Sequence, residues 1–232
     1  MEGSGPIVDP IEAVAARMEA IAEPLSPDDG VRRFNELYLA VTRAVAVESA
    51  STTFDDPAFM SRLDVIFADL YFEAIEADAA GGTLPRAWAP LFEKRAQRGI
   101  APLQFAIAGM NAHINHDLAL ALVSTTKEFA IKLDRGTPQH RDYLAINGVL
   151  ERVQDEIKDR FTTGVIRDID EAGGRVDDMF ASWSISHARD NAWTQAQTLA
   201  LLGGSAFLRS QFLLALGRNV GFAGRALLVR TG

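Results

Sequence analysis

The segment from Pro102 to Val123 holds a single acidic residue, Asp117, and no Lys or Arg. A helix on the surface of a globular protein carries a broad polar face, whereas a helix that is apolar on nearly all sides is buried. The segment is long enough for a helix of several turns and has no internal proline. It therefore predicts a central, buried helix around which the rest of the chain packs.

Helix signals recur along the whole chain, and the sustained alternation of apolar and polar residues that marks strands is missing. Capping residues followed by proline predict helix starts. They occur at Asp9-Pro10, Ser26-Pro27, Asp56-Pro57 and Thr137-Pro138. We predict an all-α fold: a single-domain helical bundle of about seven to eight helices with the buried helix at its centre, covering residues 1–232, with 1–9 flexible. The expected helices are 10–22, 27–49, 57–79, 85–97, 102–123, 138–162, 175–202 and 205–228.

Composition restricts the chemistry. The chain has no cysteine, so any metal must be held by His and carboxylate ligands. Its net charge of −8 argues against nucleic-acid binding, which needs clustered Lys and Arg. Residues 1–10 lack the pattern of a secretory signal, and we expect a cytoplasmic protein that acts on a small molecule.

The carboxyl-terminal part differs from the rest in charge. Between Leu201 and Gly232 there are four arginines and no acidic residue. Residues 205–230 predict an apolar C-terminal helix, but no uncharged stretch reaches the ~20 residues of a membrane span. Three roles remain open for this helix: a terminal core helix, a homodimer interface in place of a monomer, or an amphipathic helix in contact with an anionic membrane.

The polar residues of the central helix fall on two sides. At about 100° per residue, Gln104, Asn111 and Asn115 share one stripe. His113 and Asp117 are one turn apart on another, and His116 flanks them. Burying such groups without partners costs several kcal/mol, so each needs a hydrogen-bond partner, a metal or a solvated pocket.

These residues are our candidate site. Spaced four apart, His113 and Asp117 can supply two ligands to a divalent metal, Zn²⁺ or Fe²⁺. Asp64 is the candidate third ligand, because it lies on the inward stripe of helix 57–79 while its acidic neighbours lie on the solvated side. The alternatives are a plain His–Asp hydrogen bond and a metal-free pocket in which His113 and His116 do acid–base work.

Two further histidines lie outside the central helix. His187 follows aromatic residues by helical steps in helix 175–202, so we predict that it approaches the same cavity and joins the candidate catalytic residues. His140 stands beside Arg141 and Asp142 at a helix start. We expect it to face solvent.

Two strings resemble a known family. The runs GMNAHINHDL (109–118) and RDNAW (189–193) resemble domain-of-unknown-function family 5995, a bacterial family common in actinobacteria. The resemblance extends from Arg33 to Leu202 and implies no function. The His113-x-x-x-Asp117 spacing is also similar to part of the metal-binding pattern of all-α zinc-dependent phospholipases C and nucleases. Four histidines are too few for their trinuclear site, so that resemblance implies a mono- or dinuclear site at most.

Three hypotheses follow. The first is an enzyme whose core pocket holds a divalent metal on His113 and Asp117 and activates water for hydrolysis. Asp64, His116 and His187 are its further candidate ligands. The second is a metal-free cyclase or isomerase that binds a small organic substrate and moves a proton on a histidine. The third is a non-enzymatic helical binding protein in which His113 and Asp117 form only a structural hydrogen bond.

Overall fold

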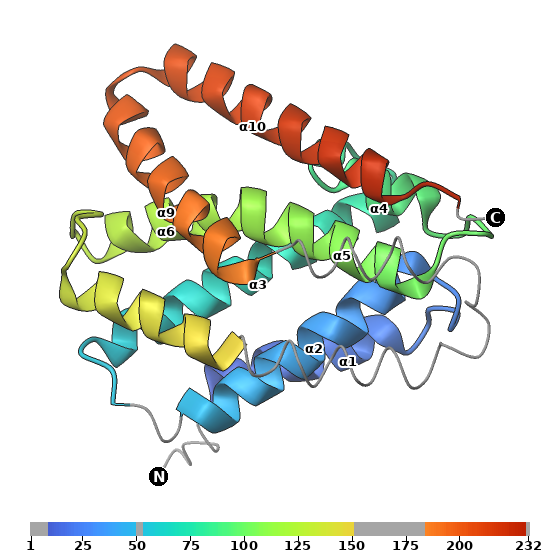
Figure 1. Ribbon diagram of the computed structural model, residues 1–232, viewed down its shortest axis with the longest axis horizontal. Coiled ribbons are helices and arrows are strands. Elements are labelled where there is room, and N and C mark those ends of the chain that lie inside the picture. Colours follow the sequence, from blue (N-terminus) through green and yellow to red (C-terminus); the bar gives the residue numbers. More distant parts are fainter. Residues whose placement is uncertain (1–8, 50–52, 151–183, 231–232) are drawn as a thin grey trace, which may run out of the picture.

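The computed structural model describes residues 9–49, 53–150 and 184–230 (Figure 1). Every regular element in these ranges is a helix, and none of them is a strand, which confirms the all-α prediction. The elements are α1 (Pro10–Ala22), α2 (Gly30–Ser49), α3 (Pro57–Ala79), α4 (Ala89–Lys94), α5 (Pro102–Ala112), the π-helical turn η1 (His113–Asp117), α6 (Leu118–Glu128), a helix over 138–150, α9 (Ile185–Leu201), the 3₁₀ turn η3 (Leu202–Gly204) and α10 (Ala206–Leu227). The expectations for residues 1–8, 151–162 and 175–183 lie outside the described residues.

Three of the four predicted helix starts are confirmed. The side chains of Asp9, Asp56 and Thr137 accept hydrogen bonds from backbone N–H groups in the first turns that follow them. The prediction at Ser26 is wrong. Ser26 Oγ accepts from the N–H of Asp28 in a local turn, and α2 begins three residues later than the proline, where Asp29 accepts from Val31 N.

The long central helix is the best-buried part of the described chain. Each residue from Gln104 to Ala112 in α5 is buried, as predicted. The helix continues through η1 into α6 and ends at Glu128, five residues beyond the expected end. In η1 the N–H of Leu118 bonds to His113 O, a span of five residues, so the turn is wider than in an α-helix.

Helices cover the central helix on several sides. In Figure 1, α5 crosses the middle of the molecule, with α10 above it and α2 and α1 below. The approach to α2 is close: a Cβ added to Gly109 would stand 2.3 Å from the ring of Phe34. The next part, α6, packs against α3 and α9. The stretch around η1 is therefore enclosed by several helices.

The amide stripe of the central helix holds the C-terminal helix in place. Gln104 Nε2 donates to the carbonyls of Leu227 and Val229, and Asn111 Nδ2 donates to that of Val220. The C-terminal helix therefore packs on the central helix of its own domain. Leu216 is buried, whereas Phe207 is 69% exposed. No described helix is long and apolar enough to cross a membrane.

Candidate functional site

A cavity of about 410 Å³ lies inside the bundle. Its volume falls within the range of ligand pockets, about 300–1,000 Å³. Residues of α1, α2, α3, α5, η1, α6, α9 and the helix over 138–150 line it, and most of them are apolar. The polar side chains with the strongest chemical interest are Tyr38, Asp64, His113 and Arg189.

His113 is held by the π-helical turn at the cavity wall. Its Nδ1 lies 3.2 Å from Asp117 Oδ2, and because a carboxylate only accepts, Nδ1 carries the proton and donates it. The other nitrogen, Nε2, then has a free lone pair. It is buried and has no hydrogen-bond partner. An unpartnered basic nitrogen of this kind is suited to accept a proton from a bound molecule.

Aromatic rings enclose the His113 imidazole. It stacks on Phe67 with ring centroids 3.6 Å apart, and Tyr38 meets it at 4.5 Å in an edge arrangement. Phe34, Tyr71 and Trp88 lie further out, with centroids about 6 Å away. Burial in this setting lowers the pKa of His113 below its usual value, and the hydrogen bond to Asp117 opposes that shift only in part. The ring is therefore neutral at neutral pH.

Asp117 is the anchor of this cluster. It is 2% exposed, and its carboxylate accepts from Trp88 Nε1 at 2.8 Å and bonds the Nδ1 atoms of His113 and His116 at 3.2 and 2.7 Å. Burial by itself raises the pKa of this carboxyl, but the hydrogen bonds from His113 and His116 outweigh it, and the pKa is lowered overall. Asp117 remains ionised and fixes the orientation of the His113 ring.

Asp64 lines the cavity, in agreement with its place on the inward stripe of α3. Burial raises the pKa of its carboxyl to about 6, and the charge of Arg189 limits the rise. Beside it, the Tyr38 hydroxyl is buried without a hydrogen-bond partner. Burial and the Asp64 charge raise the Tyr38 pKa well above its usual value, so the hydroxyl stays protonated. Asp64 and Tyr38 are thus two groups able to donate a hydrogen bond to a ligand oxygen.

Arg189 is a cation held at the cavity from α9. Its Nε donates to Asn147 Oδ1 at 2.6 Å, one terminal nitrogen donates to Tyr143 O at 2.7 Å, and the guanidinium stacks on the Tyr143 ring. Within the described ranges no carboxylate forms an ion pair with it. Asp64 lines the same cavity, and its charge acts on Arg189.

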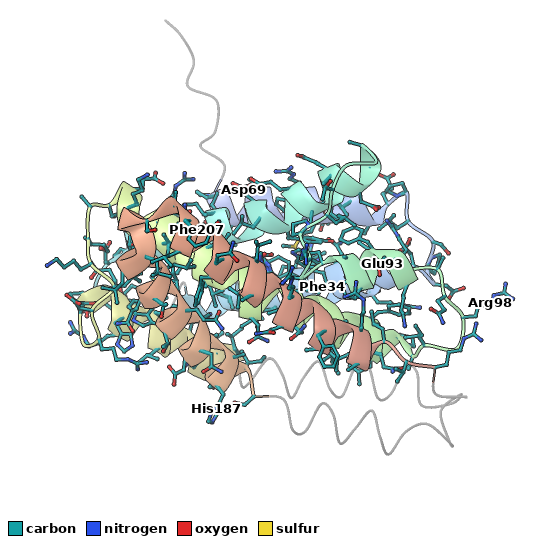
Figure 2. The ribbon with its side chains drawn as sticks, turned by 90° about the horizontal axis from the view of Figure 1, so that it is seen from above. Phe34, Asp69, Glu93, Arg98, His187 and Phe207 are labelled. Carbon is teal, nitrogen blue, oxygen red and sulfur yellow. The ribbon has the colours of Figure 1, made fainter. Side chains whose placement is uncertain are left out.

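The other predicted histidines lie elsewhere. His116 bonds Asp117 but faces α10, where a Cβ added at Gly217 would be 3.8 Å from its Nε2. His187 is exposed in the first turn of α9 and points away from the body of the molecule (Figure 2), so it does not approach the cavity as predicted. His140, expected in solvent, is buried, because its Nδ1 accepts from Gly136 N and its ring packs on Trp193.

The three predicted metal ligands do not form one coordination site. His113 and Asp117 bond each other, and Asp117 has three nitrogen partners. In the part of the chain that the structure describes, no group of three or more His, Asp and Glu side chains is placed to hold a metal ion.

Two residues of this site, Tyr38 and Arg189, were missed by reasoning from the sequence. Tyr38 reads as one more apolar position of α2, in step with Phe34 and Val41. Arg189 belongs to the RDNAW run on which the family resemblance rests, and that was the one available signal. Its pairing with Tyr143 and Asn147 joins positions more than 40 residues apart, and local pattern does not reveal it.

Fold and site together define an all-α protein with an internal, mainly apolar cavity that carries a His–Asp pair. The chain belongs to the family of unknown function DUF5995, whose model matches residues 11–230. The resemblance noted from the two sequence runs is thereby confirmed. Neither the curated proteins nor the solved structures contain a match to this chain.

Proposed function

We propose that the protein is a metal-free acid–base enzyme of the isomerase or cyclase class, acting on a small, mainly apolar organic molecule in the cavity. The observation that carries the proposal is that His113 lines the cavity while its buried Nε2 has no hydrogen-bond partner and its Nδ1 is held by Asp117. A neutral, oriented imidazole is the usual general base of metal-free proton transfer. The apolar lining supplies binding by burial of the substrate's hydrocarbon surface.

Tyr38 and Asp64 support a carbonyl compound as the substrate. Both side chains line the cavity, and the Tyr38 hydroxyl has no hydrogen-bond partner. A phenol together with a carboxylic acid of raised pKa can donate hydrogen bonds to an oxygen on which negative charge develops.

The chemistry then needs no redox partner. The substrate class is a ketone with a C=C bond one carbon beyond its α-carbon. His113 Nε2 takes a proton from that α-carbon, the C–H electron pair forms a new C=C bond, and the π pair of the carbonyl moves onto its oxygen. Tyr38, and Asp64 in its protonated form, stabilise this dienolate by hydrogen bonds. The imidazolium returns the proton to the far carbon of the original C=C bond as the carbonyl re-forms, so the product is the conjugated isomer of the substrate.

The test follows exchange of carbon-bound hydrogen. The full-length protein is incubated with 2-tetralone or cyclohexanone in D₂O, with and without EDTA, and loss of the α-proton signals is recorded by NMR. We expect exchange above the buffer rate that survives EDTA and falls at least tenfold in His113→Gln. His187→Gln is the matched control, because His187 is exposed outside the cavity, and it should exchange like the wild type.

Exchange that is absent from the wild type, or equal in His113→Gln, would overturn the proposal. The close packing of five aromatic rings around His113 favours one other function, a ligand-binding protein without catalysis. That function predicts saturable binding of the same ketones, measured by calorimetry, with no exchange.

A further inference from the structure

One side of α10 carries large apolar residues that the bundle does not cover. At about 100° per residue, Phe207, Leu214, Arg218, Phe222 and Arg225 fall within about 80° of one another. Phe207 is 69%, Leu214 39% and Phe222 75% exposed. We call these five residues the outer stripe of α10; Figure 2 shows Phe207, at one end of the stripe, on the surface.

The outer stripe is not needed to dock the helix. Other positions of α10 are buried, and they are Leu216, Gly217, Val220, Gly221 and Gly224. A Cβ added to Gly221 would stand 2.4 Å from Arg86 O, so this part of α10 lies directly on the loop that precedes α4. The helix is thereby fixed with the outer stripe facing outward.

The charge of this region is of one sign. From Asn191 to Gly232 the chain has four of its 23 basic residues and none of its 31 acidic ones, although the whole chain carries −8. Arg225 has one acidic neighbour, Glu93 on α4, at 3.5 Å. Arg209 and Arg218 form no ion pair within the described part of the chain. The outer stripe itself is therefore apolar and cationic at once.

We propose that α10 lies flat on an anionic membrane surface. A helix that presents Phe and Leu between arginines is suited to this position, because its apolar side chains enter the boundary between headgroups and acyl chains while the guanidinium groups meet lipid phosphates and carboxylates. The described helices contain none that could span a bilayer, so the contact is peripheral.

A second copy of the chain fits the outer stripe less well. Pairing two outer stripes would bring Arg218 and Arg225 of both copies onto one apolar interface, and the stripe offers no carboxylate to pair with them. Like charges that are desolvated together oppose association. The occupant must bring negative charge, as phosphatidylserine headgroups do.

Vesicle flotation of the full-length protein tests this proposal. The vesicles are phosphatidylcholine alone or phosphatidylcholine with phosphatidylserine, at low and high salt. We expect the bound fraction to be high only on vesicles with phosphatidylserine and to fall at least tenfold at high salt, in the double variant Phe207→Ser/Phe222→Ser and in Arg218→Glu. These side chains are exposed or unpaired, so circular dichroism should show an unchanged fold.

Matched control variants distinguish binding through the outer stripe from non-specific binding to vesicles. Val47→Ser removes another apolar residue, 76% exposed on α2, and Arg98→Glu reverses an exposed charge at the end of the molecule opposite Phe207 (Figure 2). Both should bind like the wild type.

The proposal is overturned by a wild type that does not float, by equal binding to neutral vesicles, or by undiminished binding of the double variant. A concentration-dependent dimer that the double variant abolishes, without flotation, would assign the stripe to a protein interface instead.

Discussion

The His113 imidazole lies flat on the Phe67 ring, with planes 6° apart and centroids 3.6 Å apart. Together with Tyr38 on its edge, Phe67 shields the imidazole from water. Asp117 is then the group that would stabilise the protonated, positively charged form of the ring. The cost of burying an imidazolium exceeds that compensation, which is the reason for the lowered pKa. The proposed base is thus ready to act at neutral pH.

This relationship predicts the titration of His113. In ¹H–¹⁵N NMR spectra, with the signal assigned by its loss in His113→Gln, the ring should titrate below pH 6.5 and show Nδ1 protonated and Nε2 free in its neutral form. Because the folded pKa is lower than the unfolded one, the folded protein should lose stability as pH falls below about 6.5. A midpoint at or above 6.5, or a proton on Nε2, would contradict the assignment.

Asp117→Asn should destabilise the protein strongly. The amide cannot accept from three nitrogen donors, and its NH₂ group would face at least one of them. Disrupting a buried, charged hydrogen-bond cluster typically costs about 3–5 kcal/mol. Urea unfolding followed by circular dichroism measures the loss. Asp69→Asn on α3 is the control, because its side chain is 48% exposed beside Arg17, and its change should stay below about 1 kcal/mol. Similar losses in both variants would show that Asp117 is not an anchor.

Asp64→Asn should stabilise the protein in a pH-dependent manner. Burial raises the pKa of Asp64 to about 6, so the folded state favours the neutral carboxyl, whose benefit is complete below about pH 3.8 and is lost as pH rises through 6. Asn stays neutral throughout. The gain in free energy of unfolding over the wild type should therefore grow between pH 4.5 and pH 7.5, by about 1–3 kcal/mol for a shift of about two pH units. Equal gains at both pH values would mean that the carboxyl is not shifted.

The fold was largely predictable from local features. Charge-poor composition identified the central helix, and Asp9 and Asp56 identified helix starts, because burial and capping leave a direct trace in the sequence. Ser26 was misread since a Ser-Pro pair can also form a turn, and Asp29, three residues on, accepts the first-turn N–H instead. The π-helical turn was not expected, because a wheel of 100° per residue assumes an ideal helix.

The candidate site was only half predictable. His113, Asp117 and Asp64 stood out because each is a polar residue on an apolar stripe. Tyr38 and Arg189 did not, since an amphipathic tyrosine or arginine is ordinary in any helix, and their importance comes from contacts between distant segments. For the same reason His187 was placed at the cavity, although the first turn of α9 leaves it in solvent.

Gly109→Ala tests the close approach of the central helix to α2. In an exposed helix this change would stabilise by about 1 kcal/mol, because alanine favours the helix. Here the new methyl carbon would stand 2.3 Å from Phe34 Cγ and 2.4 Å from its Cδ2, and Phe34 is fully buried against Tyr71 and Trp88, so its ring has no room to withdraw. Overpacking of this kind costs about 1–3 kcal/mol.

We expect Gly109→Ala to show a net loss of stability in urea unfolding. We also expect weaker ketone binding, because a shift of Phe34 moves Tyr38, which stacks on it at 5.7 Å and lines the cavity. Gly203→Ala, at a position with nothing within 4 Å of the added carbon, should change neither. A Gly109→Ala protein as stable as the wild type would show that α2 and α5 can move apart. The relative position of Tyr38 and His113 would then be less fixed than the contacts between their helices imply.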